Sequence, residues 1–214
     1  MKLKNYFPVI ILASISILIG FLNYKSGTWL TGWDNLHPEF NFLLNIKRSV
    51  FAVWQEYQGL GLLGGMGHAS DLPRQLILFV FSLFVKTNYL RYIWTSLMLI
   101  IGPIGVYQLL QTVLPDNLNI DKKKIYGFLG GLFYLLNLST VQIFFVPFEA
   151  FVTHYGFLPW LLTLTFSYLR SGNRKTLIYF IILSLIGSTQ AYVPALFVVY
   201  CMALLMIFIP EMFK

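Results

Sequence analysis

Acidic side chains beside aromatic residues are the groups in this sequence best suited to chemistry. Asp34 follows Trp33, and Glu149 follows Phe148. A carboxylate can act as a general base on a hydroxyl group, and it can also ligate a divalent cation such as Mg²⁺, Mn²⁺ or Ca²⁺. The alternative for Asp34 is a turn or a helix cap before Pro38, and the alternative for Glu149 is a structural salt bridge.

Polar side chains that could bind a substrate surround these two acids. The candidates are Arg48, His68, Asp71, Arg74 and His154. Lys86 and Arg91 are further cations of the same part of the chain. A guanidinium group holds phosphate through two parallel hydrogen bonds, so these arginines suit a lipid-linked phosphate. Structural ion pairs and phospholipid headgroups are the alternatives for the same cations.

The composition excludes several classes of protein. Of 214 residues, 57% are hydrophobic and 11% are charged, whereas a soluble domain carries about 25% charged residues. A soluble fold of this size could not bury so many apolar side chains, which excludes an ordinary cytosolic enzyme, a disordered chain and a nucleic-acid-binding domain. The composition therefore predicts an all-α, polytopic membrane helix bundle, with the lipid bilayer as its partner.

Apolar runs predict six membrane-spanning helices in a single domain of residues 1–214. They cover about residues 6–22, 90–114, 125–139, 152–169, 177–193 and 195–210. The first run has about 17 residues, which is long for the apolar part of a signal peptide, and no A-x-A cleavage site follows it. The run Gln75–Val85 is too short to cross a bilayer, which needs about 20 residues, and we expect it on the outer leaflet.

Basic residues predict the orientation of these helices. Lys122–Lys124 and Arg170–Lys175 form two short basic loops, which should face the cytoplasm together with Lys2 and Lys4. Both chain ends are then cytoplasmic, and a loop of about residues 23–89 lies outside. The sequence thus predicts a multi-pass protein of the cytoplasmic (inner) membrane with its active site on the outer face.

The outer loop contains a pattern typical of an amphipathic helix that starts near Leu36. Its apolar face comprises Phe40, Leu43, Leu44, Val50, Phe51 and Trp54, and its polar face comprises Asn41, Asn45 and Arg48. Such a helix lies flat on a bilayer surface, so the predicted outer loop carries juxtamembrane helices. The alternative is a helix packed against the membrane-spanning helices.

Glycines mark two further segments. Gly59–Asp71 holds five glycines and predicts a flexible outer loop whose backbone could approach a ligand. Its letters match G-x-G-x-x-G, but no predicted strand precedes it, so we reject a dinucleotide site. Gly127 and Gly131 form a G-x-x-x-G pair, which predicts close packing between helices.

The order of these elements resembles the GT-C class of integral-membrane glycosyltransferases. In that class an acid follows the first helix, as Asp34 does here, and a large outer loop with juxtamembrane helices precedes helix pairs joined by short loops. Short motifs are more narrowly similar to bacterial arabinofuranosyltransferases. These motifs are Val53–Gln55, Gly67–Pro73, Gly131–Asn137, Phe148-Glu149 and Leu158–Trp160. Members are about twice this length, so we expect an N-terminal portion.

The resemblance implies an enzyme that moves a sugar, arabinofuranose in the narrower comparison, from a polyprenyl phosphate to a glycan or lipid acceptor. Asp34 would deprotonate the acceptor hydroxyl, and Glu149 would position the sugar. By their charge and predicted side, Arg48, Arg74 and His68 would stabilise the departing phosphate. The alternative is a non-enzymatic polytopic membrane protein, either a transporter or a polyprenyl-lipid flippase. The transporter is disfavoured because the centres of the predicted spans lack ionisable residues.

Overall fold

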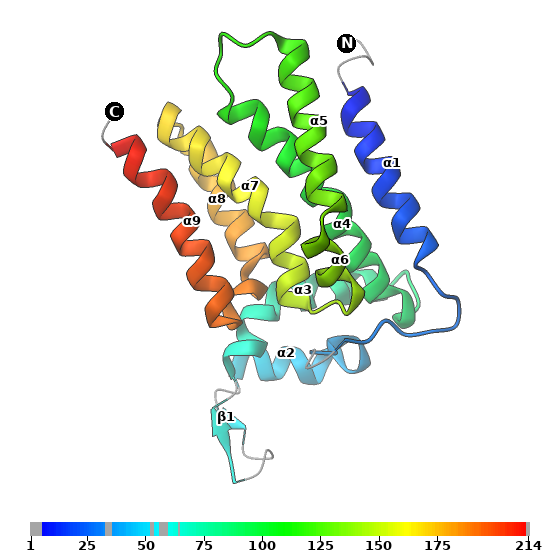
Figure 1. Ribbon diagram of the computed structural model, residues 1–214. Helices are drawn as coiled ribbons and strands as arrows, with labels where there is room; N and C mark the ends of the chain where they lie inside the picture. The colour runs from blue at the N-terminus through cyan, green and yellow to red at the C-terminus, as the bar shows by residue number, and fades with distance from the viewer. Residues whose placement is uncertain (1–5, 33–35, 52–53, 56–59, 64, 213–214) are drawn as a thin grey trace.

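The computed structural model describes residues 6–32, 36–51, 54–55, 60–63 and 65–212 (Figure 1). The regular secondary structure of these residues is helical apart from one antiparallel pair of two-residue strands, in which Trp54 lies opposite Leu63. The helices are α1 (Phe7–Leu22), η2 (Pro38–Phe40), α2 (Phe42–Phe51), α3 (Gly65–Ser82), α4 (Thr87–Val113), α5 (Ile120–Leu136), α6 (Leu138–Phe145), α7 (Glu149–Ser171), α8 (Arg174–Ile186), η3 (Ser188–Tyr192) and α9 (Pro194–Met212). The strands are β1 (Trp54–Gln55) and β2 (Leu62–Leu63). The all-α prediction is confirmed.

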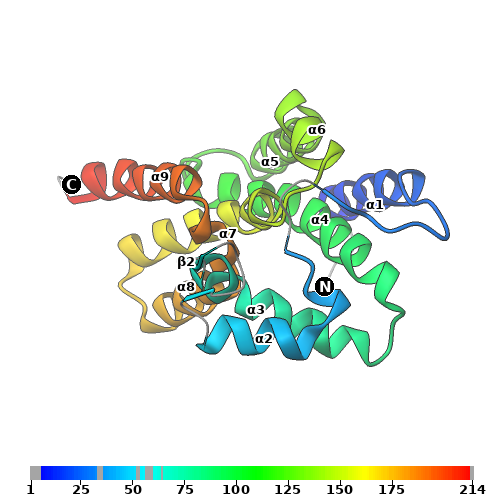
Figure 2. The same cartoon turned by 90° about the horizontal axis from the view of Figure 1, so that it is seen from below.

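Two groups of helices with different directions make up the fold. The helices α1, α4, α5, α7, α8 and α9 stand side by side, whereas α2 and α3 lie crosswise below them (Figures 1 and 2). We call this the α2–α3 end. The start of α1, the end of α9, the α4–α5 connection and the α7–α8 connection lie at the opposite end, which we call the terminal end. Each upright helix therefore joins the two ends of the bundle.

The centre of the bundle is the contact between α4 and α7, which depends on small residues. A Cβ atom added to Gly102 would lie 2.6 Å from the Tyr155 ring, and one added to Gly156 would lie 2.5 Å from Met98 Sδ. Neither distance leaves room for a methyl group, so the two backbones approach closely. The core around this contact contains Leu90, Trp94, Met98, Val152, Phe157 and Leu161.

The G-x-x-x-G pair of α5 has the packing role that its spacing predicts. Gly127 and Gly131 are both buried. A Cβ atom on Gly131 would lie 2.7 Å from Leu12 Cδ1 and 2.8 Å from the backbone oxygen of Pro103. The prediction is therefore confirmed, because these glycines allow α5 to approach α1 and α4.

Large apolar side chains cover the outward surface of the upright helices. The exposed ones include Phe7, Ile10, Ile17, Leu18, Phe21 and Leu22 of α1, Ile178, Ile181, Ile182 and Leu185 of α8, and Val198, Val199, Met202, Leu205, Met206 and Ile209 of α9. By length and composition, α4 is the one described helix that could cross a bilayer, and α5 with α6 could form a second, bent span. The helices α1 and Pro194–Pro210 are apolar but shorter. Six spans remain a prediction.

Two of the predicted spans are broken in the structure. The run 125–139 is divided at Asn137, whose side chain accepts a hydrogen bond from Thr140 N (3.0 Å) and starts α6 at 45° to α5. The predicted span 177–193 is wrong beyond residue 186, because α8 ends at Ile186 and η3 follows after Gly187. With 13 residues, α8 is about 20 Å long, shorter than the roughly 30 Å hydrocarbon core of a bilayer.

Two further predicted boundaries differ from the structure. Lys122–Lys124 were expected in a loop, but they lie in α5, which Asn119 caps by accepting a hydrogen bond from Asp121 N (2.8 Å). Gly59–Asp71 was expected to be a flexible loop, but α3 already begins at Gly65, because its first turns continue into the apolar run that begins at Leu76. The run Gln75–Val85 thus belongs mainly to a longer helix.

The chain between α1 and α3, which was predicted to lie outside and which we call the outer segment, contains the predicted amphipathic helix, but this helix starts later than predicted. The short η2 begins at Pro38, and α2 begins after Asn41, whose side chain accepts a hydrogen bond from Leu44 N (3.0 Å). The apolar face of α2 is open, since Leu43 is 75% exposed and Phe51 is 77% exposed. The polar side of α2 faces α3 through Ser49, whose hydroxyl donates to Gln75 Oε1 (3.2 Å).

Candidate functional site

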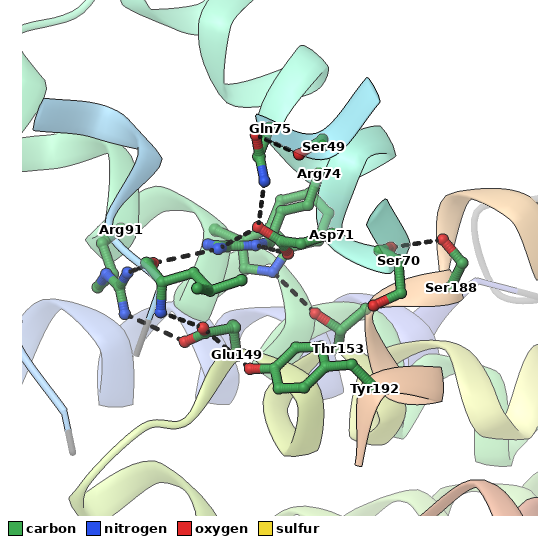
Figure 3. A network of polar contacts seen from close by, with 12 residues as sticks. Ser49, Ser70, Asp71, Arg74, Gln75, Arg91, Glu149, Thr153, Ser188 and Tyr192 are labelled. Carbon is green, nitrogen blue, oxygen red and sulfur yellow. Dashed lines mark hydrogen bonds and ion pairs between the residues drawn. The ribbon is translucent and has the colours of Figure 1, made fainter. Parts of the chain in front are cut away.

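A buried network of charged side chains holds the peptide groups of Leu36 at the α2–α3 end (Figure 3). The backbone N–H of Leu36 donates to Glu149 Oε1 (2.5 Å). Its carbonyl oxygen accepts from Arg91 Nη2 (2.5 Å) and from Arg74 Nη2 (3.4 Å). Three elements, α3, α4 and α7, therefore bind one residue of the outer segment.

Arg91 is the cation at the centre of this network. Its Nε atom donates to Glu39 Oε1 (2.9 Å) and its Nη1 atom donates to Glu149 Oε2 (3.5 Å). The side chains of all three residues are buried. Burial raises the pKa of the Glu39 carboxyl, but the nearby Arg91 charge opposes this, and the pKa ends below its usual value. Glu39 is therefore ionised at neutral pH.

Asp71 and Arg74 form a second buried ion pair one helical turn apart on α3. Arg74 Nε donates to Asp71 Oδ1 (2.6 Å) and Arg74 Nη2 donates to Asp71 Oδ2 (2.8 Å), so the pair is bidentate. Burial lowers the pKa of the Arg74 guanidinium, but the Asp71 charge opposes this effect and outweighs it, so the net pKa lies above its usual value. Gln75 Nε2 also donates to Asp71 Oδ2 (3.3 Å).

Glu149 is positioned by the start of α7 and by η3. It is the first residue of α7, where the exposed N–H groups of a helix favour a negative charge. The Tyr192 hydroxyl of η3 donates to Glu149 Oε1 (3.0 Å). The same turn is fixed to α3, because Ser188 Oγ donates to the backbone oxygen of Ser70 (2.7 Å; Figure 3). Glu149 thus joins the outer segment to three helices.

The network holds more negative than positive charge. Glu39, Asp71 and Glu149 supply three carboxylates, whereas Arg74 and Arg91 supply two guanidinium groups. The Oε2 atom of Glu39 is buried and has no hydrogen-bond partner among the described residues. Within the described residues no group of three or more acids, histidines or cysteines could hold a metal ion.

The structure brings some of the predicted site residues together and leaves others apart. Glu149, Asp71 and Arg74 belong to the network. Asp34 lies outside the described residues, as does the side chain of His68. Arg48 is half-buried on α2, next in sequence to Ser49.

His154 lies on α7 away from this network. Its Nδ1 atom pairs with Gln190 Oε1, and its ring meets that of Tyr200 edge-on at 6.3 Å between centroids. Of the four predicted substrate-binding residues whose side chains the structure describes, three are enclosed: Asp71 is 0% exposed, Arg74 is 1% exposed and His154 is 9% exposed, whereas Arg48 is half-buried. Arg74 would have to leave Asp71 before it could bind a phosphate.

Three residues of the network were missing from the predicted site. Arg91 carries a sequence signal, because a cation near the start of a long apolar run needs a partner. Glu39 follows Pro38 at the start of η2, and the chemistry of this segment was assigned from the sequence to the neighbouring Asp34. Tyr192 carries no signal, since a tyrosine at the end of an apolar run is common at a membrane interface.

Comparisons with known proteins do not supply a function for this chain. Compared with family models, with curated proteins and with solved structures, the chain has no significant match in any of the three. Function must therefore be inferred from the residues themselves.

Proposed function

We propose that the chain is the membrane-embedded portion of a glycosyltransferase of the cytoplasmic membrane. The enzyme moves a sugar from a polyprenyl phosphate to a glycan or lipid acceptor on the outer face. The observation that carries this proposal is the ion network around Leu36, because it gathers Glu39, Asp71 and Glu149 at one end of a bundle with an apolar surface. Charged groups buried in such a bundle are costly and are retained for function or for pairing.

The spacing of polar contacts along α4 and α7 supports a membrane location. Arg91 contacts Glu149 near the start of both helices, and Arg170 Nη1 donates to the backbone oxygen of Thr112 (2.7 Å) near their ends. Arg91 and Thr112 are 21 residues apart on α4, and Glu149 and Arg170 are 21 residues apart on α7. At 1.5 Å per residue, each separation is about 32 Å. This length matches the roughly 30 Å hydrocarbon core of a bilayer.

The distribution of basic residues supports the orientation. The first turns of α5 carry Lys122–Lys124, and the α7–α8 connection is flanked by Arg170 and Arg174. Both lie at the terminal end, which is therefore the cytoplasmic end by the positive-inside rule. The α2–α3 end then faces outward, and the open apolar face of α2 lies in the outer leaflet.

Accessibility of single cysteines tests this orientation. In a background with Cys201→Ala, Leu60→Cys should react with an impermeant maleimide added to intact cells, because Leu60 is fully exposed beyond α2. Asn173→Cys, between α7 and α8, should react only after the membrane is opened. Labelling of Asn173→Cys in intact cells, with Leu60→Cys protected, would reverse the orientation and remove the proposed active site from the outer face.

A transfer assay tests the activity itself. The full-length protein, reconstituted in liposomes, should release free polyprenyl phosphate from a radiolabelled polyprenyl-phosphate sugar and should label a glycan or lipid acceptor. Empty liposomes give the background rate. Asp121→Asn, an exposed position at the terminal end, should transfer as fast as the wild type. An absence of transfer from arabinofuranose and from a panel of other polyprenyl-phosphate sugars would exclude the proposed function.

A non-enzymatic membrane protein is the second candidate, and one observation favours it. Both oxygens of Asp71 and of Glu149 accept hydrogen bonds from other residues of the network. Carboxylates satisfied in this way suit a purely structural role, in which the network fastens the outer segment to the bundle. A polyprenyl-lipid flippase or a transporter would then bind the donor lipid in the same assay without cleaving it.

A further inference from the structure

We propose that His37 and Glu39 form an acid–base dyad, in which His37 takes the proton from the acceptor hydroxyl. This inference rests on the proposed transferase function and deepens it, because it moves the base from Asp34 to His37. The juxtaposition that carries it is a partly exposed imidazole beside a buried carboxylate. His37 Nδ1 lies 3.3 Å from Glu39 Oε1, and the two side chains are 25% and 3% exposed.

The tautomer of His37 follows from the state of its partner. Because an ionised carboxylate can only accept hydrogen bonds, the Nδ1 atom of His37 must carry the proton that Glu39 Oε1 accepts. The other ring nitrogen, Nε2, then has a free lone pair and can accept a proton. The positive charge that results on the imidazole is stabilised by Glu39, as the acid of a Ser-His-Asp triad stabilises its histidine.

The surrounding structure fixes this dyad. Pro38 restricts the backbone between the two residues, and Phe40 N donates to the His37 oxygen (3.3 Å) in the tight turn of η2. Arg91 Nε holds Glu39 Oε1 from the side of α4 (2.9 Å). The charged groups behind this contact are Glu149 on α7 and the Asp71–Arg74 pair on α3.

The other acids of the network are poorly suited to the role of base. Asp71 and Glu149 are 0% and 3% exposed, and both oxygens of each accept bonds from protein donors. Tyr192 is a phenol, and a phenol keeps its proton at neutral pH. Among the described residues of this network, His37 alone combines partial exposure with an imidazole, the side chain that most often serves as a general base.

Exposed aromatic rings beside His37 indicate the class of acceptor. Phe40 is 60% exposed and Trp29 is 46% exposed, and their ring centroids lie 5.0 Å apart. The His37 and Phe40 rings lie 5.4 Å apart. An aromatic face carries partial negative charge and attracts the polarised C–H groups on one side of a sugar ring. These exposed rings therefore favour a sugar over a lipid hydroxyl as the acceptor.

Sugar transfer takes place in one displacement step in which His37 is the base. The acceptor hydroxyl oxygen forms a bond to the anomeric carbon of the donor sugar and gives its proton to His37 Nε2. The bond from the anomeric carbon to the phosphate oxygen breaks, and the polyprenyl phosphate leaves with the electron pair. The imidazolium then releases its proton to water, which returns His37 to its starting state.

Substitution of His37 tests the dyad in the reconstituted full-length protein. His37→Asn should lower kcat by roughly 10²–10⁴-fold, the usual contribution of a general base, with little change in the KM for the donor. Wild-type kcat/KM should rise with pH, because a general base acts only in its unprotonated form. His37→Asn should lose this rise. Lys47→Gln, an exposed change on α2, should keep the wild-type rate and profile.

Substitution of Glu39 tests how the dyad works. Removal of a negative charge disfavours the imidazolium, so Glu39→Gln should move the rise of activity to lower pH. A purely structural glutamate would lower activity without moving the profile. Full activity and an unchanged profile in His37→Asn would overturn the dyad and leave the transferase in place. Loss of activity in Asp34→Asn instead would return the base to Asp34.

A chemical probe separates the dyad from the proposed function. Diethyl pyrocarbonate modifies unprotonated imidazoles, and mass spectrometry can follow its reaction at His37. The midpoint of this reaction should lie at lower pH in Glu39→Gln than in the wild type. If the wild type transfers no sugar, the transferase proposal fails. Equal midpoints in the two proteins would show that Glu39 does not act on His37, and the dyad would then fail as well.

Discussion

Replacement of Arg91 by alanine should lower the free energy of unfolding by about 3–5 kcal/mol, the usual cost of removing one partner from a buried ion pair. Arg91 is 5% exposed and its guanidinium contacts two carboxylates and the Leu36 oxygen. Without it, the buried carboxylates of Glu39 and Glu149 lose their shared counter-charge. Chemical unfolding in detergent micelles, followed by circular dichroism, measures the loss.

The Arg91 prediction has an internal check and a matched control. The pKa of Glu39 is lowered in the folded protein, so the stability it contributes is present above its ordinary pKa and is lost as the pH falls. The cost of Arg91→Ala should therefore shrink below about pH 4, where carboxylates take up protons. Lys86→Ala, an exposed change at the start of the same helix, should leave unfolding unchanged. Equal effects of the two variants would show that the network does not stabilise the fold.

Asp71→Asn should destabilise the protein by a similar amount, again about 3–5 kcal/mol. The change preserves the shape of the side chain, but it leaves the Arg74 guanidinium, which is 1% exposed, without a counter-charge on α3. The double variant Asp71→Asn/Arg74→Met removes both charges and should recover most of the loss. The thermal unfolding temperature of the purified protein in detergent provides the measurement.

An exposed ion pair supplies the control for Asp71. Asp116 is fully exposed and lies 3.2 Å from Lys123 Nζ at the terminal end. Pairs of this kind contribute little to stability, so Asp116→Asn should leave the unfolding temperature unchanged. If the double variant were as unstable as Asp71→Asn alone, the loss would come from the hydrogen bond of Gln75 rather than from the buried charge of Arg74.

The positions of the long helices could be predicted from the sequence because their apolar runs are long and uninterrupted. The predicted spans 90–114 and 152–169 lie within two or three residues of α4 and α7. The breaks after α5 and α8 could not be predicted in this way. At Asn137 a side-chain cap redirects the chain, and at Gly187 the helix ends just before the polar run Ser188–Gln190. Both interruptions are short, so the apolar residues on their two sides were read as one span.

The candidate site was predictable only in part, and the reason lies in its contacts. Glu149 was recognisable as an acid among aromatic residues, and it does lie in the network. Its main partner on the outer segment is the backbone of Leu36, and a backbone group has no sequence signature. The pairing of Asp71 with Arg74 needs a helix, so it was hidden when this segment was read as a loop.

The bond between Leu36 and Glu149 also has a consequence for biosynthesis. The two residues are 113 positions apart in the chain. At a ribosomal rate of roughly 5–20 residues per second, Glu149 is made about 6–23 seconds after Leu36. During that interval α1 and the outer segment exist without α7, and Arg91 emerges before one of its two carboxylate partners. Docking of Leu36 onto Glu149 is therefore a late step in assembly. In a nascent chain halted before α7, the outer segment would lack its hydrogen bond to Glu149.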